Sequence, residues 1–99
     1  MTSIHHVALH VNDVSSAVGW YCGAFQCRVT YQDSTWAMLE FENVSLALVS
    51  QSEHPPHIAV THPRAERFGE LTTHRDGTRS VYVQDTSGNA VEILDANSI

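Results

Sequence analysis

The sequence predicts an α+β fold built from two tandem βαβββ modules, the second with shortened strands. Three observations predict it: short segments in which apolar and polar residues alternate, one segment with helical spacing, and a pattern that begins at His6 and restarts at His57. A chain of 99 residues is long enough for one domain. We therefore expect a single domain over residues 1–99, with one module at about 3–51 and the other at about 56–96.

The first predicted strand covers residues 4–11, where apolar and polar side chains alternate. This alternation gives the strand one aliphatic face and one face that carries histidines. The aliphatic face consists of Val7, Leu9 and Val11, and the histidine face consists of His6, Ala8 and His10.

A helix is predicted directly after this strand. Asn12 or Asp13 is suited to its N-cap, because a short polar side chain there accepts a hydrogen bond from a free N–H group of the first turn. The following apolar residues fall on one helical stripe, which contains Val14, Ala17, Val18, Tyr21, Cys22 and Phe25. We expect this stripe to lie against the aliphatic face of the first strand.

Three short strands complete the first module, at about 27–32, 35–42 and 44–50, with turn residues between them. The polar segment 50–57 follows and contains the pair Pro55-Pro56. Consecutive prolines interrupt both helices and strands, so this segment is the predicted internal boundary.

The second module repeats the beginning of the first. The segment His57-Ile58-Ala59-Val60-Thr61 has the same alternation as His6-Val7-Ala8-Leu9-His10. A helix is predicted at about 63–71, because Pro63 suits a first helical turn. A loop at 74–78 and strands at 79–84 and 90–95 complete the chain, and the turn between the two strands needs Gly88 at a positive φ.

The charged residues exclude several function classes. Five arginines and no lysine stand against 11 acidic residues, which gives a net charge of −6. We therefore expect no nucleic-acid partner, and lysine-based Schiff-base chemistry is excluded. No apolar run reaches the ~18 residues of a membrane span, and no secretory signal is visible. We expect a cytoplasmic protein with no membrane partner, in which Cys22 and Cys27 stay reduced.

Histidine is abundant, with seven residues, and two of these histidines start equivalent strands. His6 and His57 lie opposite the aliphatic side chains of their strands, and Glu92 does the same in the last strand. If helices cover the aliphatic faces, all three side chains point to the uncovered face. Two imidazoles and one carboxylate form the ligand set of a facial triad, which suits Fe, Mn, Zn, Ni or Co. The alternative is two hydrogen-bonded histidines in a sheet and a solvated glutamate.

Three segments in order resemble the vicinal oxygen chelate superfamily. They are His6-Val-Ala-Leu-His-Val-Asn-Asp-Val, Trp20-Tyr21 and Val81-Tyr-Val-Gln-Asp85-Thr-Ser-Gly88-Asn89-Ala-Val-Glu92-Ile. This superfamily contains glyoxalase I, bleomycin-resistance proteins, fosfomycin-modifying thiol transferases and extradiol dioxygenases. The resemblance covers about residues 3–96 and implies a cupped mixed sheet with helices on its outer face. It also implies one divalent metal ion per site, held by His6, His57 and Glu92, and a homodimer.

The resemblance also suggests roles for other residues. Glyoxalase-like members carry a fourth metal ligand at the position that matches Ala47, which cannot coordinate. Tyr82 matches an active-site tyrosine of the members with three ligands and is the predicted catalytic residue. The predicted substrate-binding residues are His10, Trp36, Met38 and Glu40. Glu40 also has two other interpretations, a metal ligand or a solvent-exposed carboxylate.

Two functions remain open at this point. The first is a divalent-metal enzyme acting on a small substrate that chelates the ion through neighbouring oxygens, as a lyase, isomerase, transferase or ring-cleaving dioxygenase. The alternative is a metal-free protein of the same fold that binds a drug or metabolite, with Trp36, Met38 and Tyr82 as walls. A domain with a vestigial site is a third interpretation.

Overall fold

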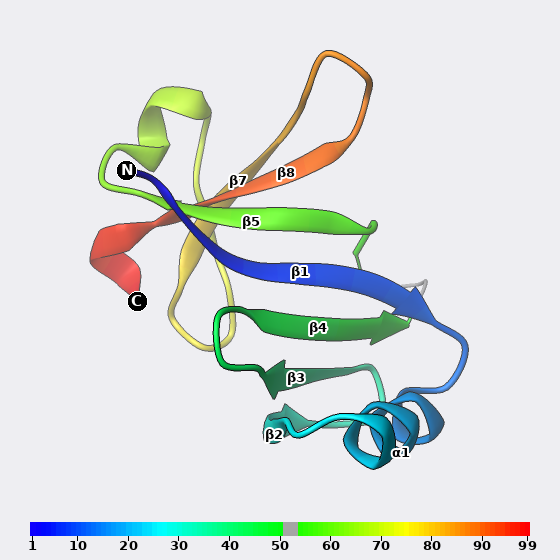
Figure 1. Ribbon diagram of the computed structural model, residues 1–99. Helices are drawn as coiled ribbons and strands as arrows, with labels where there is room; N and C mark the ends of the chain where they lie inside the picture. The colour runs from blue at the N-terminus through cyan, green and yellow to red at the C-terminus, as the bar shows by residue number, and fades with distance from the viewer. Residues whose placement is uncertain (51–53) are drawn as a thin grey trace. The chain divides into compact units, whose positions relative to one another are not determined.

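The computed structural model describes residues 1–50 and 54–99 (Figure 1). The chain forms two compact units: an N-terminal unit of His6–Pro56, and a C-terminal unit of Met1–His5 with His57–Ile99. Strand β1 (Ser3–Val11) runs through the division, since its first three residues belong to the C-terminal unit. The segment predicted as the boundary, 50–57, lies at the other point of division, and its residues 51–53 are outside the described residues.

The N-terminal unit has the predicted order of one strand, one helix and three strands. Its other elements are α1 (Val14–Ala24), β2 (Arg28–Gln32), β3 (Trp36–Glu40) and β4 (Ser45–Ser50). The strands lie in the order β2-β3-β4-β1 (Figure 1). β1 pairs with β4 in parallel, and the other two pairs are antiparallel. This mixed sheet with one helix confirms the predicted α+β class.

Helix α1 begins at the N-cap Asp13, whose carboxylate accepts a hydrogen bond from the Ser16 N–H at 2.8 Å. Hydrogen bonds from the Ser16 side chain and from the Ser16 N–H keep the pKa of Asp13 below its ordinary value. The helix buries a narrower stripe than the sequence predicts, because Cys22 and Phe25 are exposed. α1 packs on β3 and β4, and Leu9 of β1 remains partly exposed. Val11 of β1 packs against the cluster under α1, so the expected packing of the helix on the aliphatic face of β1 holds at Val11 and not at Leu9.

The two faces of this unit carry different apolar clusters. Under α1 the buried residues are Val14, Val18, Ala37, Leu39 and Leu48. The second cluster contains Ala8, Ala47 and Val49, with Trp36 and Met38 packed against them. Strand alternation places the second cluster on the face that also carries His6 and His10. His6, Ala8 and His10 therefore share one face of β1, as the sequence predicts.

The C-terminal unit contains β5 (His57–His62), β6 (Thr72–Thr73), β7 (Arg79–Gln84) and β8 (Ala90–Asp95). They lie in the order β5-β8-β7-β6, and in Figure 1 β5, β8 and β7 run side by side. β5 and β8 are parallel, and β7 is antiparallel to both of its neighbours. The short β6 lies where no strand is predicted.

The predicted helix at 63–71 is wrong. The structure has a single 3₁₀ turn, η1 (Ala65–Phe68), which ends at Gly69. Only Ala65 of this turn is buried, because the charged residues around it leave no apolar stripe for a longer helix. Gly69 has a φ of 150°, and a Cβ there would lie 3.0 Å from the Val81 side chain. A larger residue at this position would be strained by the φ angle and crowded by the Val81 side chain.

The end of the chain is fixed by local polar contacts. Asp85 accepts hydrogen bonds from the N–H groups of Ser87 and Asn89, and Gly88 has the predicted positive φ, 83°. Asp95 binds the Arg79 guanidinium at 2.7 Å and caps the final 3₁₀ turn, η2 (Ala96–Ser98). Within the described residues, every helix is too short or too polar to cross a membrane.

Candidate functional site

Three residues with predicted roles meet on one face of the C-terminal unit. The strand registers place Glu92 of β8 opposite Tyr82 of β7 and opposite Ala59 of β5. His57 lies two residues before Ala59, so alternation puts it on the same face, diagonal to Glu92. Alternation in the sequence predicts that the three side chains share a face, and the strand registers show that they are neighbours on it.

The contacts among these residues are short and lie in a buried region. The His57 Nε2 atom is 3.1 Å from Glu92 Oε1, and the Tyr82 hydroxyl is 3.3 Å from the same nitrogen. The rings of His57 and Tyr82 meet edge to face, with centroids 5.1 Å apart. His57 and Glu92 are only 7% and 6% exposed. The expectation that Glu92 is a solvated carboxylate, part of the alternative interpretation, is therefore wrong.

The second carboxylate oxygen of Glu92 has its own partners. The Ser80 hydroxyl donates a hydrogen bond to Glu92 Oε2 at 2.7 Å, and His74 Nε2 lies 2.7 Å from the Ser80 oxygen. His74 Nε2 is also 3.5 Å from Glu92 Oε2. Neither Ser80 nor His74 is among the site residues predicted from the sequence. Ser80 could have been found from the sequence, because it lies two residues before Tyr82 and therefore on the same face of the same strand.

The protonation of Tyr82 follows from its surroundings. Burial is the largest cause that raises the pKa of this phenol far above its ordinary value, and the charge of Glu92 and a hydrogen bond to it add to the shift. Tyr82 is therefore a neutral phenol at neutral pH. It can donate a hydrogen bond or a proton, whereas a phenolate would only accept one.

His6, the third predicted metal ligand, belongs to the N-terminal unit. It is buried, and in the register of β1 and β4 it lies opposite Ser45. It is the residue of β1 that directly follows the three residues grouped with the C-terminal unit. Because side chains alternate along β1, His6 lies on the same face as Ala8. This face carries the apolar cluster that includes Trp36 and Met38.

The predicted substrate-binding residues all lie in the N-terminal unit. His10 Nε2 makes a short hydrogen bond to the His54 carbonyl oxygen. Trp36 stacks on Tyr31 with ring centroids 4.4 Å apart. Glu40 is exposed and forms an ion pair with Arg28, the residue opposite it on β2. Substrate binding by His10, Trp36, Met38 and Glu40 stays a prediction.

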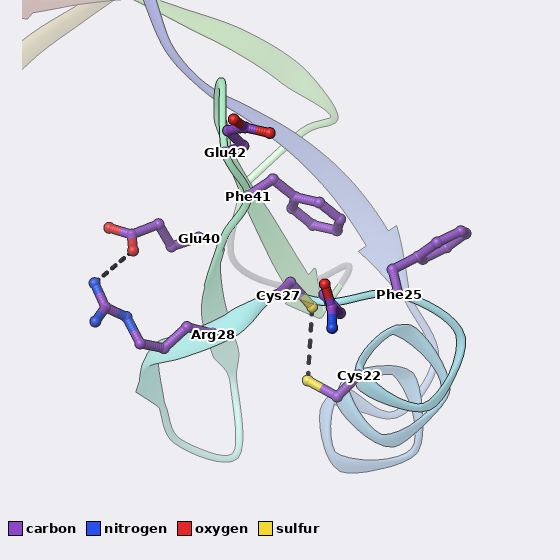
Figure 2. Close-up of a pocket in the computed structure, with 8 residues that line it drawn as sticks. Cys22, Phe25, Cys27, Arg28, Glu40, Phe41 and Glu42 are labelled. Carbon is purple, nitrogen blue, oxygen red and sulfur yellow. Dashed lines mark hydrogen bonds and ion pairs between the residues drawn. The ribbon is translucent and has the colours of Figure 1, made fainter.

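A shallow surface hollow lies where α1 leads into β2 (Figure 2). It is lined by Cys22, Phe25, Gln26, Cys27, Arg28, Glu40, Phe41 and Glu42. Both cysteines are free thiols with their sulfur atoms 3.8 Å apart, and burial and the neighbouring thiol raise the pKa of Cys27. Glu40 is the only lining residue with a predicted role, so this hollow differs from the cluster around Glu92.

Solved structures of other proteins share this fold. A hypothetical protein from Bacillus halodurans C-125 has a TM-score of 0.78 and 14% sequence identity, over 94% of this chain and 93% of that one. An NAD-dependent benzaldehyde dehydrogenase from Legionella pneumophila has a TM-score of 0.73 and 13% identity, over 90% of this chain and 96% of that one. At these identities the likeness shows the fold alone, and it confirms the predicted fold class.

The chain also matches solved structures from the family that its sequence resembles. One is a glyoxalase/bleomycin resistance protein/dioxygenase from Alicyclobacillus acidocaldarius, with 17% identity over 93% of this chain and 89% of that one. Its TM-score is 0.43. No family model and no curated protein matches the sequence.

Proposed function

We propose that this protein is a divalent-metal enzyme acting on a small substrate that chelates the ion through two neighbouring oxygens. His57 and Glu92 would hold the ion, with His6 as the third ligand. The observation that carries this proposal is the buried contact between an imidazole nitrogen and a carboxylate oxygen, with a neutral phenol beside it. A homodimer, which the family resemblance implies, and a cytoplasmic location are part of the same proposal.

The residues present fit a metal ion. Two ligand atoms that bind one ion at about 2.1 Å each, at a right angle, lie about 3 Å apart. The separation between His57 Nε2 and Glu92 Oε1 is 3.1 Å, so both atoms can bind one ion with little movement. An imidazole and a carboxylate suit Fe, Mn, Co, Ni or Zn and do not select one of them. When bound, such an ion supplies Lewis-acid chemistry toward a chelated substrate oxygen.

Side chains of the C-terminal unit would control the rest of the reaction. Tyr82 keeps its proton at neutral pH, and its hydroxyl oxygen lies 3.3 Å from His57 Nε2. From there the phenol would donate a hydrogen bond to a substrate oxygen beside that ligand. His57 and Glu92 are buried, so bulk water has little access to either side chain. Tyr82 would therefore orient the substrate and supply or hold one proton.

The charges near the site limit the substrate. The Arg79 guanidinium is bound to Asp95 at 2.7 Å, and Arg28 is paired with Glu40. The chain has no lysine, and these two arginines are already paired with carboxylates, so neither is available to neutralise a phosphonate or a polycarboxylate. We therefore expect a neutral or weakly anionic substrate, such as one with adjacent hydroxyl or carbonyl oxygens.

A second function has one specific observation in its favour. The face of the N-terminal unit that carries His6 also carries the apolar cluster of Trp36, Met38 and three small or branched residues. Such a surface suits an aromatic or aliphatic ligand without any ion. A metal-free binding protein for a drug or metabolite is therefore the alternative proposal.

Metal reconstitution separates the two functions. The protein is stripped with a chelator, reloaded in turn with Fe, Mn, Co, Ni and Zn, and analysed for bound metal. We expect about one ion per site in the wild type, and loss of this ion in His6→Ala, His57→Ala and Glu92→Ala. His62→Ala is the matched control, because His62 lies on the same strand as His57 but contacts the Arg64 N–H and Phe68. Absence of stoichiometric uptake by the wild type would leave the metal-free alternative.

A further inference from the structure

We propose that Ser80 and His74 are positioning residues for Glu92: they hold its Oε2 atom, and Oε1, which faces His57 Nε2 at 3.1 Å, would bind the ion. This inference rests on the proposed function, because it concerns the same carboxylate. It predicts that Glu92 binds the ion through one oxygen.

The hydrogen-bond directions follow from counting protons. The Ser80 hydroxyl has one proton, and it is donated to Glu92 Oε2 at 2.7 Å. The Ser80 oxygen can then only accept, so His74 Nε2, 2.7 Å away, must carry the proton and donate it. His74 therefore fixes the rotation of the hydroxyl, and the hydroxyl fixes the orientation of the carboxylate.

The place of Ser80 fits a positioning role and no direct chemical one. Ser80 is 1% exposed and is among the largest fully buried side chains of the described residues. A substrate therefore cannot reach the Ser80 oxygen. It lies on the same face of β7 as Tyr82, two residues earlier. One strand thus carries both the predicted proton donor and the group that orients the predicted ligand.

Because Ser80 and His74 hold Glu92 Oε2, they would affect how many positions of the ion Glu92 occupies. A carboxylate with both oxygens available can bind an ion through both, which uses one more coordination position. A substrate that chelates through two oxygens needs those positions open. The contacts of Ser80 and His74 would thus reserve room for the substrate, in addition to fixing the direction of Glu92.

A merely structural role for His74 is the competing explanation, since this residue begins a tight loop. The loop has separate contacts of its own: the His74 N–H donates to the Thr78 carbonyl at 2.8 Å, and the Thr78 N–H donates to Asp76 Oδ1 at 3.0 Å. Asp76→Ala removes the hydrogen bonds that the Asp76 carboxylate accepts from the Thr78 N–H and hydroxyl, and it keeps the Ser80 hydroxyl and the His74 imidazole. It is therefore the matched control for loosening of the loop.

The test is Co²⁺ binding to the chelator-stripped protein, followed by titration and by the visible absorption of the bound ion. We expect Ser80→Ala to weaken Co²⁺ binding by about 10–100-fold, as the loss of a ligand's hydrogen-bond partner does elsewhere. Its Co²⁺ spectrum should lose intensity, because a freed carboxylate raises the coordination number. Ser80→Thr, which keeps the hydroxyl, should restore most of the affinity. His74→Ala should weaken binding by about tenfold, and His74→Gln, which keeps a donor, should recover part of it.

The outcomes of the Co²⁺ titration separate the proposed function from the positioning role of Ser80 and His74. Wild-type protein that takes up no Co²⁺ would overturn both the proposed function and this inference. Tight wild-type binding, with the same affinity and spectrum in Ser80→Ala, would overturn this inference alone. If Ser80→Ala does not fold, His74→Ala decides, because its side chain is 28% exposed and its loss is tolerable. Equal weakening by Asp76→Ala and His74→Ala would assign the effect to loop order and overturn the role of His74.

Discussion

Tyr82 should keep its proton at a pH at which an ordinary tyrosine loses it. At pH 11 a phenol with a pKa of about 10 is about 90% ionised. Burial and the adjacent Glu92 carboxylate raise the pKa of Tyr82 far above that value, so it should stay largely neutral in the folded protein. The ultraviolet absorbance of ionised tyrosine, measured on metal-stripped wild type and Tyr82→Phe, isolates this residue from the other two tyrosines. The two proteins should give nearly the same tyrosinate signal at pH 11.

The same shift has a consequence for stability. Since the pKa of Tyr82 is raised in the folded state, its contribution is fully present below pH 10 and is lost as the pH rises above the unfolded value. Above pH 10 the free energy of unfolding should fall more steeply in the wild type than in Tyr82→Phe. The difference in slope has an upper limit of about 1.4 kcal/mol per pH unit for one proton, and the partial exposure of Tyr82 reduces it. A tyrosinate signal from Tyr82 already at pH 10, with parallel stability curves, would refute this description of its surroundings.

Three further predictions concern other parts of the molecule. Leu48→Ala should lower the free energy of unfolding by about 2–5 kcal/mol in urea titrations, because Leu48 is completely buried under α1. Oxidised glutathione should convert Cys22 and Cys27, whose sulfur atoms are 3.8 Å apart, into one internal disulfide. Mass spectrometry should show the loss of two hydrogens, whereas Cys22→Ser should gain a mixed disulfide. The Arg79 guanidinium lowers the pKa of Asp95, so its stabilising effect is lost as the pH falls below about 4. Asp95→Asn should flatten this acidic part of the pH–stability curve.

Alternation along single strands made the meeting of three side chains on one face predictable. The side chains of His57, Tyr82 and Glu92 each stand opposite aliphatic neighbours in their own strand, and a sheet brings such faces together. The antiparallel pairing of β7 with β8 then sets Tyr82 directly opposite Glu92. The candidate residues were therefore visible from the sequence, although their distances were not.

Other features depend on contacts that a local pattern does not contain. Ser80 looks like an ordinary strand residue until the register with β8 and the return of the 74–78 loop bring Glu92 and His74 to its hydroxyl. The helix is predicted at 63–71 because Pro63 suits a helix start. It does not form because charged residues follow Pro63 and Gly69 ends the turn. The exposure of Phe25 shows that a helical stripe in the sequence can be longer than the surface available to cover it.

X-ray absorption at the edge of the bound metal tests the central proposal most directly, because outer-shell scattering counts the imidazoles on the ion. The protein is loaded with the metal that reconstitution selects, and wild type, His57→Ala and the control His62→Ala are compared. We predict two imidazoles per ion in the wild type and in His62→Ala, and one in His57→Ala. A spectrum without imidazole scattering, or an imidazole count that His57→Ala leaves unchanged, would contradict the proposed ligand set.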